Sequence, residues 1–335
     1  MKRSTSELVE RYAAGERQFA GIDLAGADLS GLHLDGIDLS GANLRAADFS
    51  RSHLCGANLS GALLNSAVLT YTRFNEACLD HADLTKAELS GASLVAVSAR
   101  HAIFSGAVLR GASMRSAKLA EANFCGAMLK DINLRWANLA GANLSWTDLE
   151  GGRLSGSNLT GASLLHAKLN DTYFNAADLR GFDLSGVDLS GSRLNGVMLD
   201  GANLEAANLS QVQMRVASLR SVNFRVAQLQ GASLGRSNLS EANLVQANLS
   251  DANLSEVDLT KANLGGANLR RANLSGSQLR FAKLWAASLR ACNLREADLE
   301  GASLRGADLE GAFLEGAICA DSTEFPTGLP MSRVA

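Results

Sequence analysis

Leucine recurs at every fifth residue along most of the chain, and it does so without a slip from Leu239 to Leu274. In the register that runs from Leu24 to Leu314, 50 of 59 such positions are Leu. A period of five matches neither the helical period nor the two-residue period of a strand. Self-similarity of this length indicates a repeat architecture in which each unit stacks on the next.

Each five-residue repeat divides its side chains between an interior and a surface. The Leu positions and the mostly Ala positions two residues earlier are apolar, so both are predicted to point inward. The residue before each Leu is mainly Asn, Asp or Ser, and the two after it are rich in Ser, Arg, Glu and Gly. These three positions are expected to face water. Glycines such as Gly31, Gly61, Gly141 and Gly276 suit turns that need a positive φ.

Tandem A(D/N)LXX repeats cover about residues 19–319, and in this the chain resembles the pentapeptide-repeat family. The resemblance implies an all-β fold, the right-handed quadrilateral β-helix, in which four pentapeptides form one square coil. It implies a solenoid of about 15 four-sided coils, which grows by adding coils rather than cores.

The repeat leaves two flanking segments, so three segments are predicted: 1–18, 19–319 and 320–335. Residues 1–18 are predicted to form a short N-terminal capping helix, with Leu8, Val9 and Tyr12 on one face. Residues 320–335 leave the register and are predicted to form a C-terminal cap or tail. An open β-helix end invites association through unpaired backbone, so a monomer or an end-to-end dimer is expected.

Composition narrows the possible environment and partners. The chain has 335 residues and a net charge of −3, and no apolar run is long enough to cross a membrane. The opening segment lacks the apolar stretch of a secretory signal, and five cysteines give no even disulfide framework. These features favour a cytoplasmic protein with no membrane partner.

No catalytic constellation or cofactor motif is recognisable, so neither an enzyme nor a cofactor is expected. The leading interpretation is a non-catalytic rigid scaffold that presents flat faces for protein–protein interaction to an unknown protein partner. One alternative is a DNA-mimicking modulator of a type II topoisomerase. The resemblance suggests it, because some pentapeptide-repeat proteins protect gyrase in this way. The small net charge departs from that pattern, because mimicry needs charge of one sign along a face. A surface metal or anion binder is the second alternative.

Arginines and aromatic residues share one predicted face, because residues 20 apart stack when four pentapeptides make a coil. This face has no acidic residue among its outward positions from Ser93 to Arg236, so it could bind a phosphate backbone or an acidic protein surface, or be ordinary solvated surface. A protein is the expected partner rather than nucleic acid. The candidates are Arg115, Arg135, Trp136, Arg153, Tyr173, Arg193, Arg215 and Arg236.

Two further groups stand out. Apolar or aromatic residues at outward positions are candidate protein contacts, although drift of the repeat would also produce them. These are Leu63, Val68, Ile103, Val108, Trp146 and His166. No metal site is assigned, but one cluster, His33, Asp35, His53 and Cys55, has side chains that could share a zinc ion.

Overall fold

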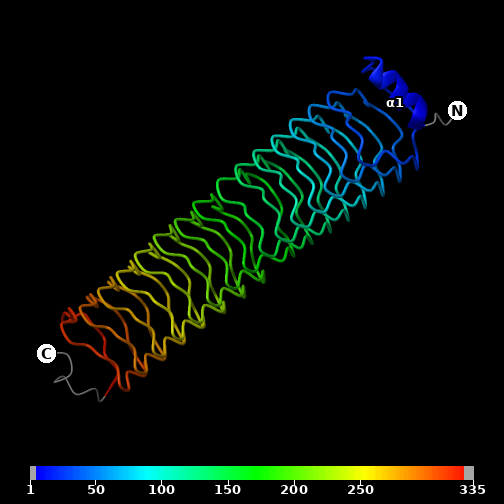
Figure 1. Ribbon diagram of the computed structural model, residues 1–335. Coiled ribbons are helices and arrows are strands. Elements are labelled where there is room, and N and C mark those ends of the chain that lie inside the picture. The colour runs from blue at the N-terminus through cyan, green and yellow to red at the C-terminus, as the bar shows by residue number, and fades with distance from the viewer. Residues whose placement is uncertain (1–4, 328–335) are drawn as a thin grey trace. The chain divides into compact units, whose positions relative to one another are not determined.

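The computed structural model describes residues 5–327, and the chain divides into two compact units, Met1–Lys168 and Leu169–Ala335. The described part of the chain contains one helix, α1 (Thr5–Ala13), and no continuous strand. Figure 1 shows coils stacked on one another within each unit. No helix among the described residues combines the length and apolar character needed to cross a bilayer. Of the predicted C-terminal cap or tail, the part beyond residue 327 lies outside the described residues.

Parallel bridges of single residues join successive coils. In the N-terminal unit they run from Gln18–Asp38 to Asp148–Lys168, always between residues 20 apart. In the C-terminal unit they run from Tyr173–Arg193 to Asp298–Ile318 with the same spacing. The last bridge joins Ser303 to Glu324 instead of Thr323, so the five-residue register shifts by one beyond Ile318. Bridged residues otherwise lie four repeats apart, and a turn in each repeat therefore gives every coil four sides.

Most corners have the hydrogen bond and the positive φ of a type II turn. In the corner after Leu24, the amide of Ala27 donates to the Leu24 carbonyl at 3.0 Å, and Gly26 between them has a φ of 69°. Every fifth residue from Gly21 to Gly316 has a positive φ in this way, whether it is glycine or not. The turn geometry therefore comes from the stacked coils as a whole, and glycine lowers its cost where it occurs.

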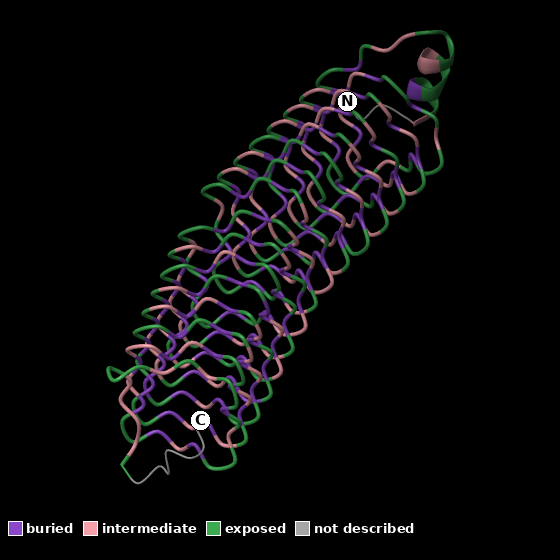
Figure 2. Ribbon diagram, turned by 90° about the vertical axis from the view of Figure 1, so that its left-hand side faces the viewer, coloured by how far each residue is buried: buried purple, intermediate pink, exposed green. Residues whose placement is uncertain are grey.

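The predicted interior is confirmed. Leu144, Leu164 and Leu184 are all buried, as are the alanines two positions before most leucines. Figure 2 shows buried and exposed stretches alternating along the coils of each unit. Where Ser or Thr takes the Ala position, its hydroxyl is satisfied by backbone: Thr72 Oγ1 donates to the Phe49 carbonyl at 2.7 Å.

The residue before each Leu is exposed or partly exposed, as expected, and it also bonds to its neighbours. Asn203, Asn223 and Asn243 are only partly exposed, and their amides form a ladder from coil to coil. The same side chains also accept hydrogen bonds from the backbone amide two residues later, as Asn223 does from Arg225 at 3.2 Å. This position is therefore a polar layer that ties adjacent coils together.

Candidate functional site

The candidate site in the N-terminal unit is a basic face, which we call the Arg face and define as Arg115, Arg135, Trp136 and Arg153. Bridges from Ser113 to Asn133 and from Asn133 to Arg153 set these residues on successive coils. The backbone fixes their spacing, because the amide of Ser116 donates to the Arg135 carbonyl at 2.9 Å. Parallel coils repeat at about 4.8 Å, so Arg115 and Arg135 follow one another in one column, and Arg153 follows Asn133 in the column two residues away.

Trp136 gives the Arg face an aromatic platform. Its side chain is 56% exposed, and the guanidinium carbon of Arg135 lies 5.1 Å from the ring centroid. The ring lies against Gly156, where an added Cβ would sit only 2.6 Å from Trp136 Cδ1. Glycine at 156 therefore lets the indole lie flat across the next coil.

The C-terminal unit carries the remaining arginine candidates. The guanidinium of Arg193 lies 4.9 Å from the centroid of the Tyr173 ring, and the backbone amide of Arg215 donates to Asn195 Oδ1 at 2.9 Å. Arg236 differs from the others because its Nε lies 3.0 Å from Glu256 Oε2. Its charge is compensated within the chain, which the acid-free window in the sequence did not reveal because Glu256 lies beyond it.

The apolar candidates lie on two sides of the N-terminal unit. Val68 and Ile103 are exposed, whereas Leu63 and Val108 are half-buried. Asp83 bridges Leu63 to Ile103 and Glu88 bridges Val68 to Val108, so each apolar pair is divided by a carboxylate. These carboxylates are engaged locally, as in the 2.6 Å bond that Thr85 Oγ1 donates to Asp83 Oδ1.

Sequence reasoning missed several exposed apolar side chains. Met128 is bridged to Val108 and is 44% exposed, so it extends that apolar column. The signal was present, because Met occupies a position where the repeat normally has Asn or Asp. Others lie in the C-terminal unit: Val216, Phe281, Trp285, Phe313 and Ile318.

Several histidine rings stack on an aromatic ring of the neighbouring coil. The Trp146 and His166 rings lie 4.1 Å apart, with exposed Leu165 beside His166 in the chain. His81 and His101 stack in parallel at 4.9 Å, and His101 Nδ1 lies 3.4 Å from Glu121 Oε2.

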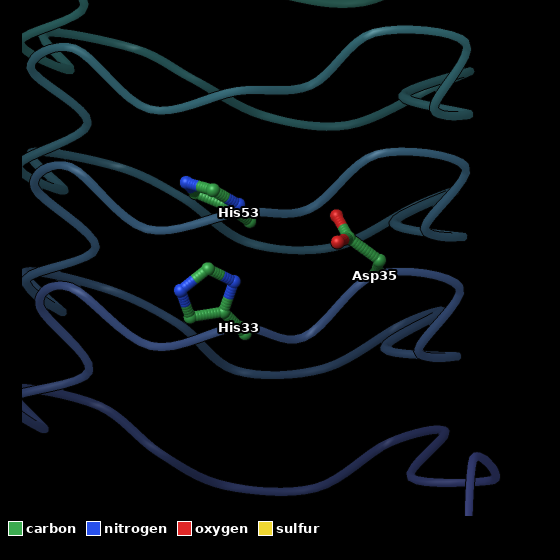
Figure 3. Close-up of side chains that lie close together, drawn as sticks. All are labelled: His33, Asp35 and His53. Atoms are coloured by element: carbon green, nitrogen blue, oxygen red, sulfur yellow. The ribbon is translucent and has the colours of Figure 1, made fainter.

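Of the predicted metal cluster, the structure brings together His33, His53 and Asp35, whose ligand atoms lie within 4.8 Å of one another (Figure 3). Cys55 does not join them. Its thiol donates to the Arg73 carbonyl at 3.8 Å, and its backbone amide donates to Asp35 Oδ1 at 2.7 Å. Burial, together with the Asp35 carboxylate, raises the pKa of the Cys55 thiol, which disfavours the thiolate that a metal would need.

The sequence was compared with known families and structures. The profile for pentapeptide repeats matches residues 22–61, 47–85, 87–124, 117–156, 137–175, 237–276, 252–284 and 286–318. The profile for a pentapeptide repeat region matches residues 167–244. No curated protein matches the chain.

Similar solved structures include three pentapeptide-repeat or resistance proteins. HetL, involved in heterocyst differentiation regulation in Nostoc sp. strain PCC 7120, is 27% identical over 96% of this chain and 98% of its own, with a TM-score of 0.22. A pentapeptide repeat protein from Nostoc PCC 7120, alr5209, is 42% identical over 29% of this chain and 80% of its own, with a TM-score of 0.29. QnrB1, a plasmid-mediated fluoroquinolone resistance protein, is 17% identical over 67% of this chain and 94% of its own, with a TM-score of 0.28.

The family assignment rests on the profile matches, which together cover well over half of the sequence in the register that the Leu column predicts. The chain belongs to the pentapeptide-repeat family, and its fold is the right-handed quadrilateral β-helix that this family implies.

Proposed function

We propose that this protein is a non-catalytic scaffold that binds a partner protein with an acidic surface through the Arg face. The observation that carries the proposal is the composition of that face. Its outward residues within 93–96, 113–116, 133–136 and 153–156 include Arg115, Arg135 and Arg153 but no Asp or Glu. Arg271 has an acid 20 residues away, Asp251, at 2.6 Å, whereas the positions 20 residues from Arg115 and Arg135 hold Val95, Arg135, Arg115 and Ser155.

The pattern favours a protein partner. Arg and Trp are the residues enriched in the binding centres of protein interfaces, because they combine apolar area with directed hydrogen bonds. Nucleic-acid binding usually draws on many phosphate contacts and a basic chain, whereas this chain has a net charge of −3. DNA mimicry would instead need an uncompensated acidic column, and Glu205, Asp251 and Glu256 are each paired with arginine.

The test compares two charge-matched double variants as baits in a pull-down from native cells. Arg115→Glu/Arg135→Glu reverses the Arg face. Arg45→Glu/Arg110→Glu makes the same net charge change with two exposed arginines on other sides of the same unit. We expect the first variant to lose a salt-sensitive partner that the wild type and the second variant retain. Equal capture by all three baits would contradict the proposal.

Binding of nucleic acid is tested with the same wild-type and variant proteins. Retention of wild-type protein on duplex DNA, lost only in the Arg-face variant, would show that the face binds phosphates instead. A further variant, Arg193→Glu/Arg215→Glu, tests the arginines of the C-terminal unit separately. We expect it to weaken partner capture only if the partner also contacts that unit.

We also propose that the chain forms about 15 coils and that α1 covers the open end of the first coil. Contacts of α1 support the cap: Leu8 is buried, and the Tyr12 hydroxyl donates to the Asp35 carbonyl at 2.9 Å. Leu8→Asp should release the helix and promote self-association, because an uncovered coil offers unpaired backbone. Sedimentation at increasing protein concentration measures this, and a variant that stays as monodisperse as wild type would remove the capping role.

A further inference from the structure

The cluster of His33, Asp35 and His53 lies near the start of the N-terminal unit and plays no part in the proposed binding face. We infer that it is a binding site for a divalent transition-metal ion, with zinc as the reference ligand. The inference rests on the backbone pairing, the reach of the donors, the orientation of the carboxylate and the chemistry of the donor set.

The two histidines are placed by backbone pairing rather than by chance contact. His33 and His53 form a parallel bridge, with the amide of Leu34 donating to the His53 carbonyl and that of His53 donating to the Leu32 carbonyl, both at 2.8 Å. Their rings lie 4.1 Å apart with planes inclined by 62°. The inclined arrangement lets one nitrogen of each ring turn toward a common point, unlike the parallel stack of His81 and His101.

The donors lie within reach of one ion. Their ligand atoms lie within 4.8 Å of one another. Donors on a tetrahedral zinc ion, at bonds of about 2.1 Å, lie roughly 3.4 Å apart. Closing that difference needs rotation of the imidazoles, and the side chain of His33 is exposed, so little packing opposes its movement.

Asp35 is held in position by the next coil. The backbone amide of Cys55 donates to Asp35 Oδ1 at 2.7 Å, so the carboxylate is fixed to the backbone of the next coil. Figure 3 shows the Asp35 carboxylate beside the two imidazoles, which come from successive coils. A hydrogen bond that orients a ligating carboxylate is a usual feature of metal sites and strengthens binding.

The donor set selects the class of ion. Two imidazoles and one carboxylate suit zinc, cobalt, nickel or copper, whereas calcium and magnesium prefer all-oxygen sites. Three protein ligands leave at least one coordination position open to water or to a group from outside the chain. Arg73 follows His53 in the same ladder, and a positive charge at this position would oppose the binding of a cation.

The experiment titrates the metal-stripped full chain with zinc by calorimetry and with cobalt by visible absorption. His33→Gln, His53→Gln and Asp35→Asn should each weaken the single site at least about tenfold. The matched control is His81→Gln/His101→Gln, which removes two imidazoles from the same unit and should leave the site intact. Cys55→Ser should also retain it, and the cobalt spectrum should lack a thiolate charge-transfer band.

Circular dichroism establishes that each variant is folded. Binding should also raise the unfolding temperature of the wild type and the control, but not of the cluster variants, because the ion binds only the folded state. Absence of binding to the wild type at 100-fold excess zinc would overturn the inference. So would equal binding by the cluster variants, or loss of binding in the His81/His101 control alone.

Discussion

Asn243 Nδ2 donates a hydrogen bond of 3.0 Å to Oδ1 of Asn223, which lies one coil earlier in the C-terminal unit. Asn223 in turn donates to Asn203 Oδ1 at 2.9 Å, so its amide both gives and receives within the ladder. A side chain in the middle of such a ladder links three coils, and its loss removes one hydrogen bond from each neighbour.

The first prediction concerns this ladder. Asn223→Ala should lower the free energy of unfolding by about 1–3 kcal/mol, because two hydrogen bonds between coils are lost and Asn243 Nδ2 is left without its acceptor at a partly buried position. Asn253→Ala is the control, since the Asn253 side chain accepts its hydrogen bond from the Ser255 amide within its own turn. It should cost less in the same urea titration. A cost for Asn253→Ala equal to that for Asn223→Ala would show that only the local turn bond matters.

Much of the fold could be predicted from the sequence, because one apolar residue in five leaves few ways to build an interior. The Leu column, the second inward position and the turn glycines follow from that period alone. The polar ladder could not be predicted in the same way. Whether Asn223 faces water or the next coil depends on coil spacing, which the residue types at one position do not reveal.

The candidate site was predictable only in part for a related reason. A coil of four pentapeptides shows which side chains stack, so the pairs His33 with His53 and Trp146 with His166 could be inferred from numbering. It does not show how side chains rotate. The thiol of Cys55 donates to the Arg73 carbonyl and is not among the ligand atoms that come together in the cluster.

The second prediction tests the interior. Leu189 is fully buried in the C-terminal unit, and Leu189→Asp would place a carboxylate there without a partner. We expect the free energy of unfolding to fall by more than about 4 kcal/mol. Backbone amides in the surrounding coils should lose their protection against hydrogen exchange. Leu189→Met keeps the volume and apolar character and should retain protection. Native-like hydrogen exchange in the Asp variant would mean that the Leu column does not hold these coils.

The third prediction concerns corner conformation. Val216 has a φ of 56° and is 64% exposed, so a β-branched residue adopts the left-handed region without compensating burial. Val216→Asn should stabilise the protein by about 1 kcal/mol, because Asn tolerates this conformation better. Val245→Asn changes a valine outside the positive-φ corners and should bring no gain in stability.

Conversely, Gly201→Ala should destabilise the protein by about 1 kcal/mol, since Gly201 has a φ of 66°. Thermal melts of the three variants decide between conformational and surface effects.

The last prediction concerns pH. Hydrogen bonds from the Arg225 guanidinium, and then its charge, hold the pKa of Glu205 below its ordinary value of 4.5. Side-chain hydrogen bonding from Arg220 likewise lowers the pKa of Glu241. A carboxyl whose pKa is depressed by folding contributes stability above its unfolded pKa and loses it as pH falls through the folded value. Stability should therefore decline as the pH drops below about 4.5, and less steeply in Arg225→Met, which removes one contributor. High salt should shrink the difference between the two proteins because Arg225 is exposed and Glu205 is partly exposed. Identical pH profiles for wild type and Arg225→Met in low-salt denaturation would show that the Glu205 pair contributes nothing to folding.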